Sequence, residues 1–520
     1  MSGIMFNLDG DTFLHSRMNC LDVINEDYLK NFILQYEETD ITDYIFNVNS
    51  TCSAIPSRVK TSYADKYLRK EEYGQTVDYT NTCCKAAYHI WNVLGLDLYQ
   101  IWIDTCRSIN INPWFSFRMN DRHHHHLLPK ASWLLSDFFY AHVEEYAHVH
   151  GRKTEFWKDR ARDYLIPEVR QEMLDYIAEM LGRYDLYGIE LDFQRELNCF
   201  PHGREEEGRE VMIGFMKEVK ALADNAQQQW GHDIKIAVRC HPDPVACYEL
   251  GFDILEYAKQ GLMDLYIAAP HFSTSDSNMP IGYWKKLLQP YGVEVAGSME
   301  SMVRPYESAP IRVCSEETFH SVESLMGVAS YVLSQGADKF YVFNVFDNHD
   351  QMMTPENRQE SNQIYMTDGH NTNAKGAYTL LSNAGSMEKL HKRRRKCILS
   401  YADTCAIGDV LRSSLPATLT KEDSLPTYLK INTGNLLSTD KVYLRLAIAG
   451  DAGKLEVYIN DRKAEYVCCE DIGFPKASKN KVYKYLVSND AYSACAQVSE
   501  LVYRGEGELV IDYADMIVEP

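Results

Sequence analysis

The segment at residues 7–11, Asn-Leu-Asp-Gly-Asp, places polar side chains directly after a short apolar run. Asn7, Asp9 and Asp11 share one parity, so in an extended strand they point to the same side. Two carboxylates and a carboxamide this close together suit proton transfer, which needs acidic or basic groups beside a substrate. The same residues are also typical of an Asx turn around Gly10, so the segment indicates a site without choosing between Asp9 and Asp11.

A second polar segment, at residues 118–126, joins an arginine to a run of histidines. It reads Arg-Met-Asn-Asp-Arg followed by four histidines, His123 to His126. Consecutive histidines point in different directions and rarely bind one metal ion together, so most of them are interpreted as loop residues. Arg118 lies directly at the end of an apolar run, and we regard it, Asn120 and His123 as candidates for binding or catalysis.

Polar residues also end several later apolar runs. Glu190, Asp192 and Gln194 alternate along one of these runs, and Arg195 follows them. The candidates at the ends of the other runs are Asn47, Asn49, Arg239, His241, His271, Glu300, Asn344 and Asp347. Alternation puts Asp192 and its neighbours on one side of an extended strand, where they could meet a substrate.

Two hypotheses explain these residues as a hydrolase site. In the first, Asp192 and Glu300 are the paired carboxylates of a conventional glycosidase that acts on a neutral sugar. In the second, Asp9 and His123 do the chemistry while Arg118, Arg195 and Arg239 hold an anionic sugar. The three arginines favour the second hypothesis, because a buried cation needs an anionic partner. Asp192 and Glu190 could also be that partner, so the first hypothesis stays open.

The elements that must position these residues are short apolar strands that alternate with amphipathic helices up to about residue 390. The predicted strands are Ile4–Leu8, Tyr44–Val48, Pro113–Phe117, Gly188–Phe193, Lys235–Val238, Leu265–Ala269, Glu294–Gly297 and Lys339–Phe343. Helical spacing of apolar residues predicts helices at Pro167–Arg183 and Arg209–Gln228. Repeated strand–helix units of this number predict a (β/α)₈ TIM-like barrel, an α/β fold whose active site lies at the carboxyl ends of the strands.

The pattern changes after about residue 397 to alternating runs broken by turn residues. These runs are Lys441–Ala449, Lys454–Ile459, Val482–Val487 and Glu508–Tyr513. They predict a C-terminal antiparallel β-sandwich. We therefore divide the chain into a catalytic barrel at 1–396, with a bridging helix at Ala374–Ile398, and an accessory sandwich at 397–520.

Composition limits the classes of partner. The formal net charge of −21 argues against nucleic acid, which is bound by clusters of basic residues. The one basic run, Lys392 to Lys396, is interpreted as the solvated face of a helix. An anionic substrate would need a local group of arginines to reverse the negative field.

The sequence also predicts the compartment and the state of the cysteines. No apolar stretch reaches the length of a membrane span, and the first residues resemble no leader peptide, so the chain as given is expected to be cytoplasmic. A secreted or periplasmic location would follow if a leader had been removed. Cys83–Cys84 and Cys468–Cys469 are adjacent pairs, which form disulfides poorly, so reduced and buried thiols are expected.

Four segments together resemble the inverting exo-sialidases of glycoside hydrolase family 156. They are NLDGD at 7–11, FRMNDRH at 117–123, YGIELDFQR at 187–195 and FNVFD at 343–347, followed by the sandwich. The resemblance covers essentially the whole chain, and FRMNDRH is its most specific part because it fixes the spacing of an arginine and a histidine.

The resemblance implies roles for individual residues. Asp9 and His123 would be the catalytic pair, Arg118 and Arg195 would bind the carboxylate of sialic acid, and Asn344 would bind the sugar. Further substrate contacts are expected from Asn120, Asp11, Asn47, Arg239, Asp192 and Glu300. The choices between Asp9 and Asp11, and among His123 to His126, stay open.

The implied chemistry fits the residue types. Sialic acid carries a carboxylate at its anomeric carbon, so a carboxylate nucleophile at about 4 Å would be repelled by several kcal/mol at an effective dielectric of about 20. A neutral imidazole avoids this repulsion, and His123, polarised by Asp9, could activate water with inversion.

The expected partners are therefore sialylated glycans, with no nucleic acid, membrane, metal or cofactor, and the resemblance suggests a homodimer. Two alternatives come from other classes. The aspartates and histidines could bind a divalent ion in a metal-dependent deacetylase. Alternatively, Gln194 could stand where some barrel hydrolases keep a catalytic glutamate, and the chain would be a non-catalytic sugar-binding protein.

Overall fold

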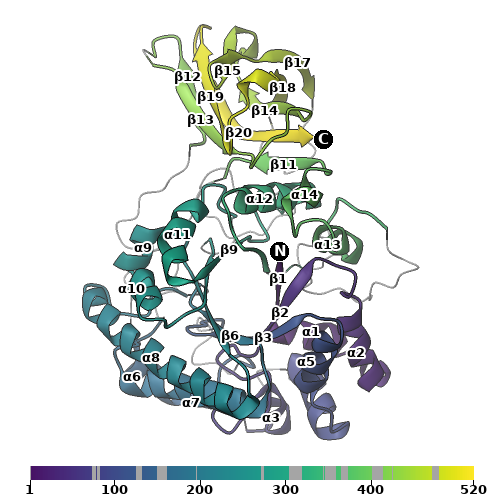
Figure 1. Ribbon diagram of the computed structural model, residues 1–520, viewed down its shortest axis with the longest axis vertical. Helices are drawn as coiled ribbons and strands as arrows, with labels where there is room; N and C mark the ends of the chain where they lie inside the picture. The colour runs from purple at the N-terminus through teal and green to yellow at the C-terminus, as the bar shows by residue number, and fades with distance from the viewer. Residues whose placement is uncertain are drawn as a thin grey trace.

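The computed structural model describes residues 2–72, 78, 82–124, 132–148, 161–194, 196–270, 275–303, 319–343, 345, 359–364, 373–400, 414–423, 425–470 and 480–520. Eight parallel strands close into a barrel in the order β1-β10-β9-β8-β7-β6-β3-β2 (Figure 1). They are β1 Gly3–Leu8, β2 Ile41–Asn47, β3 Asn112–Arg118, β6 Gly188–Asp192, β7 Lys235–Cys240, β8 Leu265–Ala268, β9 Glu294–Ser298 and β10 Lys339–Phe343. All eight predicted strands are present, and the predicted (β/α)₈ barrel is confirmed.

Helices surround the barrel and connect its strands (Figure 1). They are α1 Gly10–Arg17, α2 Glu26–Leu34, α3 Tyr63–Leu68, α4 Cys83–Tyr88, α5 Leu98–Ser108, α6 Asp137–Tyr146, α7 Pro167–Arg183, α8 Glu205–Trp230, α9 Pro244–Glu249, α10 Ile254–Lys259, α11 Ile281–Leu288, α12 Val322–Ser334, α13 Ala374–Leu381 and α14 Met387–Leu390. The predicted helix at 167–183 is α7, whose first residue is a proline with a preset φ. The longest, α8, ends at Gly231, whose left-handed φ of 81° terminates the helix.

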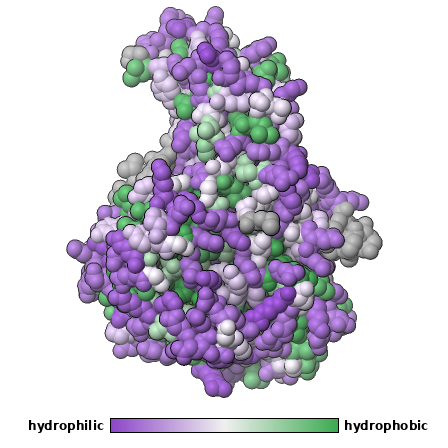
Figure 2. Space-filling view, in the orientation of Figure 1, coloured by the Kyte–Doolittle hydropathy of each residue, from purple (hydrophilic) through white to green (hydrophobic). Residues whose placement is uncertain are grey.

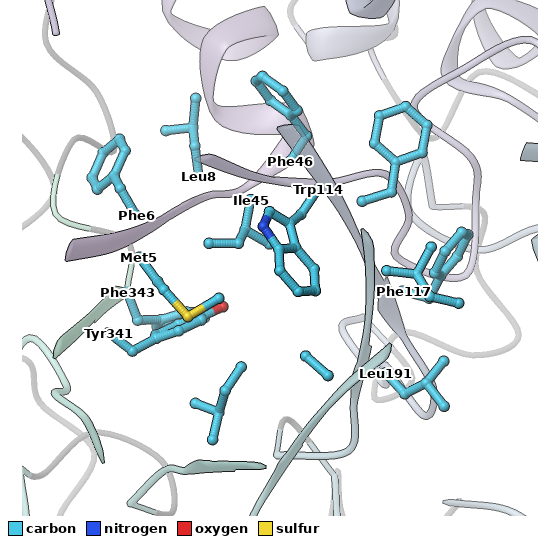
Figure 3. Close-up of a cluster of buried hydrophobic side chains, with 14 of the residues drawn as sticks. Met5, Phe6, Leu8, Ile45, Phe46, Trp114, Phe117, Leu191, Tyr341 and Phe343 are labelled. Carbon is cyan, nitrogen blue, oxygen red and sulfur yellow. The ribbon is translucent and has the colours of Figure 1, made fainter. Parts of the chain in front are cut away.

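The barrel interior is largely apolar in the middle of the strands and polar at their carboxyl ends, and near the amino ends the buried Asp43 accepts from Nε1 of Trp114 at 3.0 Å. Figure 3 shows Met5, Ile45, Trp114 and Tyr341 converging inside the ring of strands, whereas Phe6 points outward toward the helices. Residues that follow the inward ones at intervals of two also point inward. The inward positions nearer the carboxyl ends are polar and buried, and they include Asn7, Ser116, Glu190 and Arg239.

The C-terminal part is the predicted antiparallel sandwich. One sheet has the order β11-β20-β14-β18-β17, with β12 also paired to β20, and the other has the order β13-β19-β15-β16. The strands are β11 Arg395–Ile398, β12 Ala417–Thr420, β13 Thr427–Asn432, β14 Lys441–Ala449, β15 Leu455–Ile459, β16 Arg462–Lys463, β17 Glu465–Glu470, β18 Lys481–Val487, β19 Ala496–Tyr503 and β20 Glu508–Glu519. Their inward residues form a separate hydrophobic core that includes Leu429, Leu444 and Ile511.

The predicted bridging helix at 374–398 is wrong. This segment forms α13, then α14, which Ser386 caps by accepting from the backbone N–H of Lys389, and finally the strand β11. The basic run is therefore not a solvated helical face along its length, because Arg395 and Lys396 are buried in β11. Pairing of β11 with β20 makes this strand part of the sandwich.

Other expectations from the sequence have mixed outcomes. The described cysteines are free thiols, and Cys83 and Cys84 are buried as expected, but Cys469 is exposed. None of the helices in the described segments is long and apolar enough to cross a membrane. Figure 2 shows a largely hydrophilic face that narrows between the barrel and the sandwich.

Candidate active site

Asp9 and Arg118 form an ion pair at the carboxyl end of the barrel. Asp9 directly follows β1 and is the first residue before α1, but its side chain makes no capping hydrogen bond to that helix. Its carboxylate instead accepts from Nη2 of Arg118, the last residue of β3. Because β2 lies between β1 and β3, this ion pair must cross part of the barrel interior. The Asx-turn interpretation is therefore not needed for Asp9.

Asp121 links Arg118 to His123. Its Oδ2 accepts from Nη1 of Arg118 at 3.0 Å, and its Oδ1 lies 2.8 Å from Nδ1 of His123. The backbone N–H of His123 also donates to Asp121 Oδ1 at 2.9 Å. A proton on Nδ1 directed at this carboxylate leaves the lone pair on Nε2, which makes Nε2 the basic nitrogen. The imidazole is 40% exposed, so solvent or a substrate can reach it.

Charges in this part of the site strongly affect one another. Burial alone lowers the pKa of Arg118, but Asp9 and Asp121 outweigh burial, and the net pKa is well above the usual value. The pKa of Asp11 is raised, first by burial and then by the neighbouring carboxylate of Asp9. The raised pKa means that Asp11 keeps its proton to a higher pH than an ordinary aspartate does.

A second charged group lies on the opposite strands. Nη1 of Arg239 on β7 donates to Asp192 Oδ1 at 3.0 Å, and its Nη2 lies 3.4 Å from Glu300 Oε1. The guanidinium carbon is 4.2 Å from the ring centre of Phe343 on β10. The predicted carboxylates Asp192 and Glu300 therefore meet at one arginine, and the backbone N–H of Gln194 also donates to Asp192.

Glu190 lies one inward position before Asp192 on β6 and is fully buried. The hydroxyl of Ser116 donates to its Oε1 at 2.6 Å. Burial and the charge of Asp192 raise the pKa of Glu190 to about 7, although Arg239 opposes them. A carboxyl group with this pKa can hold or release a proton near neutrality, which is a property often found at functional sites.

The remaining predicted residues have less direct roles or lie outside the described segments. Asn47 donates to the backbone oxygen of Ser116 at 3.5 Å. Asn120 donates to the backbone oxygen of Asn198 and accepts from the backbone N–H of Arg162, so it ties loops together. Arg195, Asn344, His271, Asp347, His125 and His126 lie outside the described residues.

Sequence reasoning missed several residues of this site. Asp121 was visible in the segment at 118–126, but alternation favours every second residue of a strand, and Asp121 lies in the loop beyond it. Arg122 and Glu196 lie in two such loops, and Nη2 of Arg122 is 2.7 Å from Oε2 of Glu196. The carboxamides of Asn7 and Gln194 are buried, and within the described part of the chain nothing hydrogen-bonds to them. Buried amides of this kind are usually satisfied by water or a ligand.

No three His, Cys, Asp or Glu side chains of the described residues are grouped so that they could hold a metal ion. The charged groups of the site are instead paired with one another. What they offer chemically is a partly exposed imidazole backed by a carboxylate, and two arginines held by acidic partners.

Comparison with known proteins gives no family. No family model matches the chain, and no curated protein matches it. Solved structures with similar folds include a chitinase of Paenibacillus sp., which is 9% identical with a TM-score of 0.41 over 96% of this chain and 53% of that one. An α-amylase of H. orenii is 10% identical with a TM-score of 0.34 over 96% of this chain and 99% of the amylase.

A cycloisomaltooligosaccharide glucanotransferase of Paenibacillus sp. is 8% identical with a TM-score of 0.35, and the match covers 98% of this chain and 57% of the transferase. This chain therefore spans just over half the length of the transferase and of the chitinase. Similarity at this level carries no information on the activity of this chain.

Proposed function

We propose that this chain is a glycoside hydrolase that removes terminal sialic acids with inversion at the anomeric carbon. One observation carries the proposal: contacts run continuously from Asp9 through Arg118 and Asp121 to His123 at the carboxyl end of the barrel. In characterised barrels of this kind, the active site lies at this end. The resemblance of the sequence segments to family 156 supplies the substrate class.

In this mechanism His123 is the general base. Its Nε2 takes a proton from a water molecule, which attacks the anomeric carbon on the face opposite the leaving group. The glycosidic bond breaks as the new bond forms, and the aglycone oxygen takes a proton from solvent and leaves as an alcohol. Asp121 keeps the proton on Nδ1 and stabilises the imidazolium that forms, as a carboxylate partner does for other catalytic histidines. Asp9 pairs with Arg118 and holds it in place, and its negative charge helps to polarise the imidazole of His123.

The carboxylate of the substrate is bound by arginine in this proposal. Arg118 is buried, and its Nε has no acceptor among the described residues, so at least one donor remains beyond those given to Asp9 and Asp121. Arg195, one residue after Gln194, is the second proposed ligand. Charge-assisted hydrogen bonds of this kind are roughly twice as strong as neutral ones.

The test of the proposal is stereochemical. A sialoside is digested in an NMR tube, and the proton spectrum is followed from the first minutes. Inversion of an α-sialoside releases the β-anomer first. An initial α-anomer would exclude the single displacement, and no release of sialic acid from any sialoside would overturn the proposed function.

A conventional glycosidase that uses Asp192 and Glu300 is the second candidate. Its supporting observation is that both carboxylates converge on Arg239. The same observation weakens it, because Arg239 already engages both carboxylates inside the barrel, whereas such an enzyme needs one of them to donate a proton to the leaving group. Activity that survives in Asp9→Asn and His123→Ala but is lost in Asp192→Asn and Glu300→Gln would establish this candidate instead.

A further inference from the structure

Arg122, the residue before His123 in the chain, is a buried arginine with few acceptors among the described residues. Arg122 lies between Asp121 and His123, and its side chain is 0% exposed. Its Nη2 donates to Oε2 of Glu196 at 2.7 Å. Its Nε and Nη1 are buried, and neither has an acceptor among the residues that the structure describes.

The other two arginines of the site are better satisfied. Arg118 donates to Asp9 and Asp121, and Arg239 donates to Asp192 and Glu300. In each of them only Nε lacks an acceptor within the described segments. Arg122 has one carboxylate and two unmet nitrogens, so its positive charge is the least compensated of the three.

This arrangement is incomplete without a further acceptor. A guanidinium stays charged at any pH that the protein meets, and burying its N–H donors without acceptors is unfavourable. An oxygen of an anion would satisfy both the donors and the charge. Glu196 is 12% exposed, so solvent, and with it an anion, can reach the pair from the side of Glu196.

We propose that Arg122 binds the anionic group of the ligand of this site, a carboxylate, and that Glu196 occupies part of that position when the ligand is absent. The next residue in the chain is His123, the proposed base, whose side chain is 40% exposed. The naming of the anion as the sialic acid carboxylate rests on the proposed function. The proposal that Arg122 binds a carboxylate does not rest on the proposed function.

The first experiment therefore uses malonate as a simple carboxylate probe. Thermal unfolding of the full chain is followed in sodium malonate and in sodium chloride of equal ionic strength. We expect malonate to stabilise the wild type more than chloride does, Arg122→Gln to lose that difference, and Arg122→Lys to keep part of it. No difference in the wild type, or an undiminished one in Arg122→Gln, would overturn the proposal.

Glu196→Gln distinguishes anion binding by Arg122 from a purely structural role of the Arg122–Glu196 ion pair. It has nearly the same shape as the native residue but removes the competing charge, so we expect its apparent affinity for malonate to rise several-fold. A purely structural ion pair predicts lower stability in Glu196→Gln with no gain in affinity. Arg395→Gln is the matched control, because Arg395 is also buried beside a single carboxylate, that of Asp440, but lies in the sandwich. Its malonate response should equal that of the wild type.

The second experiment links Arg122 to the substrate. Binding of N-acetylneuraminic acid and of its methyl ester is measured by calorimetry. Arg122→Gln should bind the acid at least tenfold more weakly and the ester equally, whereas a structural role would weaken both alike. If the wild type cleaves sialosides and Arg122→Gln keeps its preference for the acid, the inference is wrong and the function stands. If no sialoside is cleaved but the malonate result holds, the proposed function is wrong and the anion site stands.

Discussion

Asp121 contacts both Arg118 and His123, and this favours His123 as the base of the proposed mechanism. It accepts from Arg118 at 3.0 Å and contacts Nδ1 of His123 at 2.8 Å. The next residue, His124, has a left-handed φ of 65°, and its Nδ1 lies 2.7 Å from the hydroxyl of Ser132. Because a carboxylate partner stabilises an imidazolium, the contact of His123 with Asp121 supports His123 as the base.

Asp121→Asn tests this assignment. The variant keeps the shape of the side chain but loses the charge and can favour the wrong tautomer of His123. We expect kcat on a sialoside to fall by about 10²–10⁴, the usual contribution of a positioned acid or base. His124→Ala serves as the control and should lose much less. A kcat in Asp121→Asn close to that of the wild type would contradict the proposed dyad.

Glu190 gives a prediction about stability and pH. Its pKa is raised to about 7 by burial and by Asp192, while Arg239 lowers it. The folded chain therefore keeps a proton that the unfolded chain releases between about pH 4.5 and 7, so this group makes the protein less stable as pH rises through that range. Ser116 and Tyr341 also face it and carry no charge at these pH values.

In Glu190→Gln the side chain is neutral at every pH, so the variant should not lose this stability as pH rises. Relative to the wild type, its free energy of unfolding should rise between pH 4.5 and pH 8 by up to about 3 kcal/mol, because each unit of pKa shift corresponds to about 1.4 kcal/mol. Urea denaturation of both proteins at the two pH values measures this difference. A difference that is constant with pH would show that Glu190 is already ionised in the folded protein.

At the scale of elements, the site depends on how tightly β1 and α1 meet β2. A Cβ atom at Gly10 would lie 2.1 Å from the backbone oxygen of Asn47, and backbone cannot move aside as a flexible side chain can. The absence of a side chain at this position lets α1 start directly after Asp9. The close approach therefore fixes where the Asp9 carboxylate meets Arg118.

Gly10→Ala should disturb both stability and activity. We expect a loss of about 1–3 kcal/mol, typical of overpacking, together with reduced turnover because Asp9 is displaced. Thermal unfolding and sialoside kinetics measure the two effects. Gly214→Ala in α8 is the control: no atom lies within 4 Å of the added Cβ, so it should stabilise the helix by about 0.5–1 kcal/mol. Equal behaviour of the two variants would contradict the packing argument.

At the scale of the whole molecule, the sandwich is anchored to the barrel through α12. A Cβ atom at Gly327 of α12 would lie 2.2 Å from the backbone oxygen of Lys396 in β11. The hydroxyl of Ser330, one turn later, donates to the backbone oxygen of Thr433 at 3.1 Å. Asn432 adds a contact by donating to Asn278 at 2.7 Å. Figure 1 shows α12 directly beneath the sandwich, so this helix serves both parts.

Gly327→Ala is predicted to weaken the coupling between the two parts. The added methyl group must push β11 away from α12, at a cost of about 1–3 kcal/mol. Calorimetry should show the unfolding of barrel and sandwich separating further in temperature than in the wild type. Gly182→Ala in α7, where the added Cβ meets no atom within 4 Å, should leave the profile nearly unchanged. An unaltered profile in Gly327→Ala would mean that the contact does not couple the parts.

The sequence by itself determined the strands of the barrel and four strands of the sandwich, β14, β15, β18 and β20. Burial is encoded locally, because an inward side chain at one position makes its second neighbour inward as well. The apolar runs therefore predicted all eight barrel strands, and the period of two predicted β14 with its observed bounds. The segment at 374–398 was predicted wrongly, because short helices and an adjoining strand give no single period. The sandwich strands β12, β13, β16, β17 and β19 were not predicted.

Only the tertiary structure decided which charges meet. Asp9 and Arg118 are 109 residues apart, and Asp192 and Arg239 are 47 apart, so no local pattern pairs them. Closure of the barrel brings these strand ends together, and ion pairing in a buried space then depends on distances of a few ångströms. The loop residue Asp121 became part of the site for the same reason, since loops follow no period that a sequence displays.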